Sequence, residues 1–258
     1  MNIYRKRILK CLKSFYIAHR GLFENSGDAP ENTILAFKKA VNAGYGIELD
    51  VQITKDKRIV VAHDYDLKRI CGEDILIKDL TYQELRKYKV LNSNESIPLL
   101  EDALGVINGK VPLIVEIKTE SDYKEVTMLT SKILSSYSGL YCVESFSPFV
   151  IGWYKKNNPK IIRGQLADDL VQKKHFKSHF KNWILTNMVF NLFYKPDFIA
   201  YNHEYGGNKC IRFWKRLLGC SLAAWTIRSQ EELERAAEKF DIFIFDGFLP
   251  AVKTGTEH

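Results

Sequence analysis

The chain lacks several features that mark particular classes of protein. It has only five cysteines in 258 residues, scattered and without a Cys-x-x-Cys pair. A disulfide framework is therefore not expected, and reduced thiols in a cytoplasmic protein are the better interpretation. No apolar run reaches the roughly 18 residues of a membrane span. Internal repeats and recognisable nucleic-acid-binding modules are also absent, so we expect no nucleic-acid partner.

The composition suits one large α/β domain, since 46% of the residues are hydrophobic and 27% are charged. The net charge is +7, and the basic residues gather in the N-terminal segment and around 173–181 and 209–216. Such a surplus suits anionic partners, either phosphodiesters or acidic membrane surfaces. An ordinary solvated surface explains it equally well.

Residues 1–14 form a separate basic segment, which lacks the continuous apolar core of a signal peptide. Ile3, Ile8 and Leu12 recur at roughly helical spacing, which predicts a short amphipathic helix. Such a helix either makes a peripheral membrane contact or closes the bottom of the domain formed by residues 15–258. We favour docking on the domain.

Short apolar runs alternate with helical patterns in the order of a (β/α)8 TIM barrel, an α/β fold. The expected strands are 15–19, 46–51, 113–118, 141–145, 161–165, 198–201, 221–226 and 242–246. The expected helices are 33–43, 99–108, 122–136, 148–156, 172–193, 207–218 and 229–239. The segment 183–194 is unusually apolar, and we expect a buried barrel helix there; a hydrophobic lip that admits an acyl chain is the alternative.

A hairpin and a small insertion interrupt the second βα unit. The connection 54–57 is too short for a parallel crossover, so 58–62 should fold back antiparallel to the preceding strand. Residues 64–98 then form an insertion over the site, with a helix opened by the capping box Thr81-x-x-Glu84. The hairpin returns the chain to the carboxyl end of strand 46–51 and so brings His63 near Glu48 and Asp50.

Glu48 and Asp50 are the first candidates for a metal site. Side chains alternate along a strand, so both carboxylates point the same way and repel each other. A cation should therefore lie between them, and a divalent metal is the simplest one. Glu116 also ends an apolar strand, and the three carboxylates together suit Ca²⁺ or Mg²⁺. His19 and His63, near the ends of other apolar runs, are candidates for proton transfer.

Five spaced motifs carry a family resemblance: His19-Arg20-Gly21, Pro30-Glu31-Asn32-Thr33, Glu48-x-Asp50, His63-Asp64 and Glu116-Ile117-Lys118. In this order they resemble the glycerophosphodiester phosphodiesterase family, and the match extends from about Phe15 to Pro250. The resemblance implies cleavage of glycerophosphodiesters to sn-glycerol 3-phosphate and an alcohol. It leaves open which histidine is the acid and which the base.

Three further side chains are candidates for binding the substrate. Arg20 offers a fork suited to phosphate oxygens and Lys118 a point charge, although Arg20 can instead pair with Glu31 or Asp64. Trp225 resembles the family's late aromatic residue, which would line a glycerol pocket, and core filling is nearly as good an explanation.

Two other positions are interpreted without a site role. Asn32 is expected to help start the helix that follows it; orienting neighbouring loops or histidines is the alternative. The ending Phe245-Asp246-Gly247-Phe248 departs from the family's usual Thr-Asp-x-Pro, so Asp246 is not counted among the site residues.

Two other functions remain open. One is a lysophospholipase D-like activity on lysolipids, on the same kind of barrel. The other is a non-catalytic protein that binds phosphodiesters or anionic membranes, against which the intact His19 and His63 argue.

Overall fold

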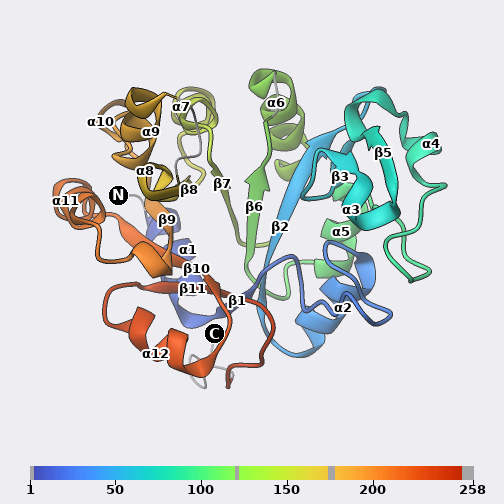
Figure 1. Ribbon diagram of the computed structural model, residues 1–258, viewed down its shortest axis with the longest axis horizontal. Coiled ribbons are helices and arrows are strands. Elements are labelled where there is room, and N and C mark those ends of the chain that lie inside the picture. The colour runs from blue at the N-terminus through green and yellow to red at the C-terminus, as the bar shows by residue number, and fades with distance from the viewer. Residues whose placement is uncertain (1–2, 120–121, 174–177, 252–258) are drawn as a thin grey trace.

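A closed barrel of eight parallel strands forms the centre of the computed structural model, which describes residues 3–119, 122–173 and 178–251 (Figure 1). The first strand pairs with both the last and the second, which closes the sheet. This confirms the expected (β/α)8 fold. The barrel strands are β1 (Tyr16–Ala18), β2 (Gly46–Ile53), β6 (Leu113–Ile117), β7 (Tyr141–Ser145), β8 (Arg163–Ala167), β9 (Phe198–Asn202), β10 (Ser221–Ile227) and β11 (Ile242–Phe245).

Helices cover the outside of the barrel, and local sequence explains where several begin. Thr33 caps the first of them by accepting a hydrogen bond from the Ala36 amide, and Ser229 caps the last through the amide of Glu232. Pro148 occupies the first turn of another, where no amide donor is needed. These helices are α2 (Ile34–Asn42), α5 (Leu100–Ile107), α6 (Tyr123–Leu134), α7 (Pro148–Asn157), α11 (Lys209–Leu218) and α12 (Gln230–Ala237), with a short 3₁₀ turn η2 (His203–Tyr205) before α11.

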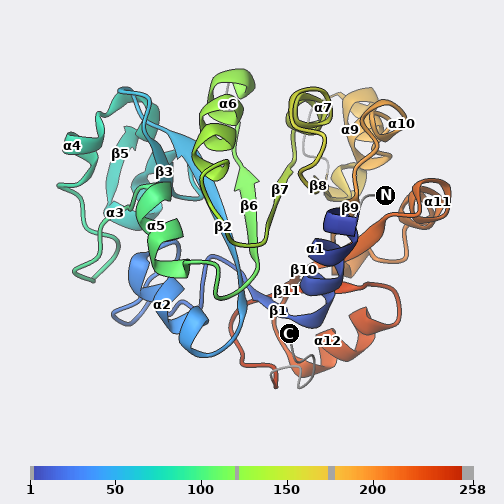
Figure 2. The same ribbon diagram turned by 180° about the vertical axis from the view of Figure 1, so that it is seen from behind.

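The N-terminal helix α1 (Ile3–Ser14) packs against the bottom of the barrel (Figure 2). Ile8 and Leu12 are fully buried in one cluster with Ile17 and Ile114, which point into the barrel interior. The basic side chains on the other side of α1 remain exposed, Lys10 among them. The helix therefore docks on the domain, as expected, and its apolar face is not available to a membrane.

The expected hairpin is present, because β3 (Ile59–Val61) runs antiparallel to the end of β2. Lys57 takes a positive φ of 63° at the turn. The insertion that follows has its own apolar cluster and contains the expected capping box between Thr81 and Glu84. Its elements are β4 (Asp66–Leu67), α3 (Lys68–Cys71), β5 (Glu73–Leu76), the 3₁₀ turn η1 (Ile77–Asp79) and α4 (Tyr82–Leu85).

The expected helix 172–193 is wrong. In its described residues the segment forms three short helices: α8 (Leu170–Lys173), α9 (His179–Thr186) and α10 (Asn191–Tyr194). Met188 takes a positive φ of 49°, which a continuous helix cannot contain. The expected burial is also wrong at Trp183 and Phe193, which are 53% and 65% exposed. Among the helices described, none is long and apolar enough to cross a bilayer.

Candidate active site

Three buried carboxylates converge inside the barrel. Glu48 and Asp50 lie two residues apart on β2, so the pleat turns both to the same face. Asp50 is paired in register with Glu116 on the neighbouring strand β6. One oxygen from each carboxylate lies within 4.8 Å of the others, and all three residues are buried. The sequence-predicted ligands are therefore brought together.

The electrostatics of this cluster call for a cation. Burial raises the pKa of Glu48 well above its ordinary value, and the charges of Asp50 and Glu116 raise it further. Burial likewise raises the pKa of Glu116 to about 7, although Lys118 opposes this. Burial alone would raise the pKa of Asp50 too, but nearby positive charges, led by Lys118, hold it below its usual range. A hard divalent cation fits this all-oxygen donor set.

Lys118 supplies positive charge to the cluster. Its Nζ lies 3.1 Å from Oδ1 of Asp50 and 2.8 Å from Oε1 of Glu116. Burial lowers the pKa of Lys118, but these two carboxylates outweigh it and raise the pKa above its ordinary value. The ammonium group is therefore held in its charged form beside the two carboxylates.

Arg20 and Asn32 contact Asp50 from the other side, both with positive φ values of 57°. Nδ2 of Asn32 donates a hydrogen bond of 2.9 Å to Asp50, so Asn32 orients this carboxylate and Thr33 alone caps the helix. The expectation for Asn32 was therefore incomplete. Arg20 donates to Glu31 at 2.6 Å, and its Nε lies 3.4 Å from Asp50. The pairing with Glu31 that the sequence left open is the one present.

His19 follows β1 and is held by an acid that the sequence analysis set aside. Nδ1 of His19 lies 3.0 Å from Oδ2 of Asp246, which follows β11, and Nε2 lies 4.0 Å from Glu48. Burial lowers the pKa of His19, and the hydrogen bond to Asp246 opposes that shift. Arg228 in turn lies 3.1 Å from the second oxygen of Asp246. The sequence analysis did not foresee this contact between Asp246 and His19, because the motif around Asp246 departs from the family pattern.

His63 follows β3 beside the cluster. The neighbouring amide of Ala62 donates to the carbonyl of Asp50 at 3.0 Å, which fixes the end of the hairpin against β2. Nδ1 of His63 lies 2.6 Å from Asp64. Burial lowers the pKa of His63, and the charge of Asp50 opposes that shift. Both candidate histidines therefore have a carboxylate at Nδ1, which leaves Nε2 of each for other partners.

A network of charges supports this arrangement from outside. Arg69, on the insertion helix α3, pairs with Asp64 at 2.6 Å and with Glu31 at 2.7 Å. Burial alone would raise the pKa of Glu31, but hydrogen bonds from Arg69 and the charge of Arg20 lower this pKa to about 2. The insertion thereby connects the loops that carry Arg20 and His63.

Two aromatic residues lie near the carboxyl ends of β7 and β10: Phe146 follows β7, and Trp225 lies within β10. Trp225 is half-buried, and its ring lies 5.8 Å from the ring of Phe146, edge to face. Nε1 of Trp225 has no hydrogen-bond partner in the described part of the chain. Trp225 thus combines a buried, unpaired donor with packing against the apolar cluster inside the barrel.

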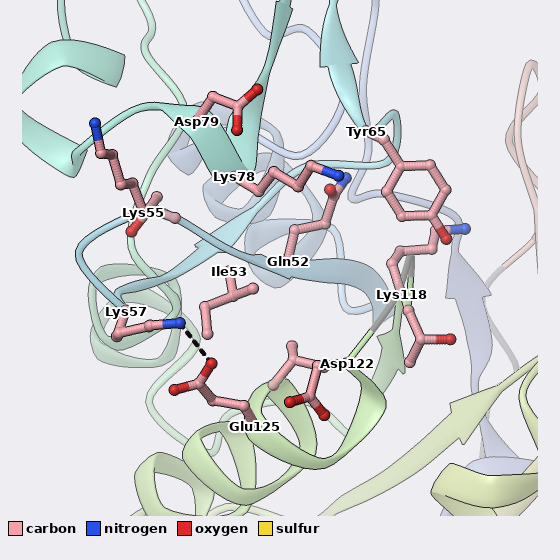
Figure 3. Close-up of a pocket in the computed structure, with 13 residues that line it drawn as sticks. Gln52, Ile53, Lys55, Lys57, Tyr65, Lys78, Asp79, Lys118, Asp122 and Glu125 are labelled. Carbon is pink, nitrogen blue, oxygen red and sulfur yellow. Dashed lines mark hydrogen bonds and ion pairs between the residues drawn. The ribbon is translucent and has the colours of Figure 1, made fainter.

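A pocket of about 340 Å³ adjoins the cluster between β2, η1 and the start of α6 (Figure 3). Lys118 and Tyr65 lie on one side, and Lys57 bonds to Glu125 on the other. Because the lining mixes lysines with carboxylates, the pocket offers donors and acceptors to a polar group.

A fourth carboxylate was missed. Glu144, on β7, is paired in register with Glu116 and is 1% exposed. Burial raises its pKa well above the ordinary value, and the charges of Glu116 and Asp50 raise it further. The sequence offered one signal for Glu144: it is an acidic residue inside the expected strand 141–145. It is not one of the three acids whose oxygens gather within 4.8 Å.

The profile of the glycerophosphoryl diester phosphodiesterase family matches residues 19–239, which span every site residue described above except Asp246. The chain belongs to this family. The resemblance found in the sequence and the expected enzyme class, a phosphodiesterase, are both confirmed.

Individual relatives agree with this membership. A glycerophosphodiester phosphodiesterase of Caldanaerobacter subterraneus subsp. tengcongensis is 30% identical over 237 residues, 87% of this chain and 90% of the relative. A phosphodiesterase of Oleispira antarctica, solved with the product sn-glycerol-3-phosphate, superposes with a TM-score of 0.75 at 23% identity, covering 90% of this chain and 93% of that one. A glycerophosphodiester phosphodiesterase of Thermotoga maritima gives 0.71 at 23% identity, covering 93% and 95%. The two structures show the barrel that this chain shares with members of the family.

Proposed function

We propose that this member of the phosphodiesterase family hydrolyses glycerophosphodiesters to sn-glycerol 3-phosphate and an alcohol with the help of a divalent cation. The convergence of Glu48, Asp50 and Glu116 within 4.8 Å carries the proposal, because so much buried negative charge suits a divalent cation, and a bound cation would attract an anionic phosphodiester. The three carboxylates would hold Ca²⁺ or Mg²⁺. When bound, such an ion neutralises charge on the phosphate as the bond to the leaving oxygen breaks.

The protein's own cations would act on the same phosphate. Lys118 is charged and lies against two of the carboxylates, so it would bind a phosphate oxygen and orient the diester. Arg20 is already paired with Glu31 and near Asp50, and would add a second donor from its guanidinium group. Trp225, with its unpartnered Nε1, would line the glycerol side of the site.

His19 and His63 would transfer the protons. One imidazole removes a proton from the attacking oxygen, and the other donates a proton to the leaving alcohol. Asp246 and Asp64 accept from Nδ1 of each ring and so keep Nε2 directed to the reaction. Burial lowers the pKa of both histidines, which keeps neutral imidazole, the form a general base needs, populated near pH 7.

A substrate screen tests the proposal. Glycerophosphocholine, glycerophosphoethanolamine and lysophosphatidylcholine are offered with Ca²⁺, Mg²⁺ or EDTA, and sn-glycerol 3-phosphate and choline are measured. We expect glycerol phosphate from the first two substrates, and none in EDTA. Unchanged rates in EDTA would remove the cation from the mechanism, and choline from the lysolipid alone would instead indicate a lysophospholipase D.

Two variants test the histidines in the same assay. His19→Ala and His63→Ala should each lower kcat by about 10²- to 10⁴-fold, the usual contribution of a proton-transfer group, with the thermal midpoint nearly unchanged. His179→Ala is the matched control, because His179 is exposed on α9. Near-normal turnover in either site variant contradicts the proton-transfer roles.

A further inference from the structure

One flank of the barrel exposes an unusual number of large apolar side chains. Of the twelve found among the described residues, six lie on helices α9, α10 and α11, which are neighbours on one side of the molecule in both views (Figures 1 and 2). We name this surface the α9–α11 face. Its apolar members are Phe180, Trp183, Leu192, Phe193, Phe213 and Leu217, each more than half exposed.

A groove of about 430 Å³ runs through the α9–α11 face. Leu192 and Phe213 line it from α10 and α11, and Lys209 stands at its edge. Nε1 of Trp214 donates a hydrogen bond of 2.8 Å to the carbonyl of Asn187, which ties α11 to the connection between α9 and α10. This hydrogen bond therefore fixes α11 against the connection that leads to α10.

The same segment is also strongly basic. Residues 171–218 contain nine lysines and arginines against two acidic residues, a surplus equal to the net charge of the whole chain, +7. Of the two acids, Asp197 is almost buried and pairs with Arg5, so Glu204 alone is exposed. Arg212 and Arg216 are exposed on α11 beside Phe213. Basic and aromatic side chains thus share one surface.

Aromatic contacts lead from this face toward the active site. Phe190 precedes α10, and its ring lies 5.8 Å from that of Phe149 in the first turn of α7. Phe146, which precedes Phe149 in the sequence, packs on Trp225. Both Phe146 and Phe149 are more than 40% exposed. Exposed aromatic side chains therefore also occur next to this face, on α7 and directly after β7.

We propose that the α9–α11 face docks the enzyme on an anionic lipid bilayer, with its aromatic side chains in the interface and its basic side chains against the headgroups. Aromatic and basic residues on one face are the combination that binds such surfaces, since apolar burial and charge attraction add. A second copy of the chain is a poorer occupant, because two such faces would repel each other. The basic helix α1 is a poorer membrane contact, because Ile8 and Leu12 pack into the barrel.

Vesicle sedimentation with the full-length enzyme tests this proposal. We expect binding to phosphatidylglycerol–phosphatidylcholine vesicles, weakening as salt rises, and much less binding to pure phosphatidylcholine. Trp183→Ser with Phe193→Ser should weaken binding at least about tenfold, because each change removes a large apolar side chain from the interface. Arg212→Glu with Arg216→Glu should weaken it similarly.

Matched controls make the result decisive. Met128→Ser with Leu249→Ser removes apolar side chains that are 53% and 69% exposed elsewhere. Lys6→Glu with Lys10→Glu reverses two exposed charges on α1. Equal binding by the face variants and these controls overturns the proposal, as does a loss confined to the α1 variant.

Two further readouts separate this proposal from its rivals. A concentration-dependent dimer that the face variants abolish, without vesicle binding by the parent enzyme, would assign the face to self-association and overturn the proposal. Turnover of soluble glycerophosphodiesters should stay unchanged in the face variants, since none of these residues contacts the carboxylate cluster. Failure of docking therefore leaves the proposed activity standing, and failure of that activity leaves docking measurable.

Discussion

Asp246→Asn tests the geometry around His19 directly. The substitution keeps the size of the side chain but removes the charge that lies 3.0 Å from Nδ1 of His19 and 3.1 Å from Arg228. A hydrogen bond to a charged group contributes about 1.5–3 kcal/mol. Since about 1.4 kcal/mol corresponds to a factor of ten in rate, kcat should fall by about 10- to 100-fold. KM should change much less, because Asp246 contacts the histidine and not the carboxylate cluster.

The pH profile of the variant then identifies the role of His19. Burial lowers the pKa of His19 and Asp246 opposes that shift, so removing the charge of Asp246 lowers this pKa further. If neutral His19 is the general base, the acidic limb of the kcat profile moves to lower pH. If protonated His19 is the general acid, the alkaline limb moves to lower pH instead. The limb that moves therefore makes the assignment that the sequence left open.

A double-mutant cycle and a matched control complete this test. If Asp246 acts through His19, adding Asp246→Asn to His19→Ala should cost almost no further activity. Asp241→Asn is the control, because Asp241 is likewise paired with basic side chains, Lys13 and Lys215, but lies outside the site. The reasoning is refuted if Asp246→Asn keeps kcat within about twofold with an unmoved pH profile, a change too small for a charged hydrogen bond.

The remaining predictions concern the metal site and the base of the barrel. Without metal, the free energy of unfolding should fall as pH rises from 4.5 to about 7, because Glu116 keeps its proton up to about pH 7 in the folded state but loses it near pH 4.5 in the unfolded state. Denaturant titrations at several pH values measure this decline, and added Ca²⁺ should flatten it. Asn32→Ala should weaken binding of the divalent cation about 10- to 100-fold in calorimetry, since Asp50 loses its orienting donor. Leu12→Ala should lower the free energy of unfolding by about 2–5 kcal/mol, whereas exposed Lys10→Ala should stay within about 0.5 kcal/mol in the same denaturant titrations.

Local pattern was sufficient for the barrel and for its acids. Strand period two places Glu48 and Asp50 on one face, and the short connection after β2 forces the hairpin that returns His63 to them. Glu116 follows because parallel neighbours end at the same edge of a sheet, and its register with Asp50 is direct. Each of these inferences needs only a few consecutive residues and the rules of strand geometry.

The contacts that the sequence analysis did not foresee join residues that are far apart in the sequence. Asp246 and His19 are 227 positions apart in the sequence, so the residues around Asp246 give no sign of their hydrogen bond. Asn32 sits beside a good helix cap, and its bond to Asp50 is visible only when β2 stands next to that loop. The apolar run 183–194 suggested burial, but composition alone cannot distinguish a core helix from an apolar face that meets another surface.

The contact between His19 and Asp246 links the chemistry to closure of the barrel. His19 follows β1 and Asp246 follows β11, and these strands pair directly, with the amide of His19 donating to the carbonyl of Phe245 at 2.9 Å. The carboxylate cluster lies on the adjacent strands β2 and β6, which pair directly with each other and without β1–β11 contacts between them. A change that loosens the seam between β1 and β11 should therefore disorder His19 before it disturbs the acids. Helix α1 packs on β1 and β11 at the base of that seam, so the N-terminal helix stabilises the strands that hold the histidine and its acid together.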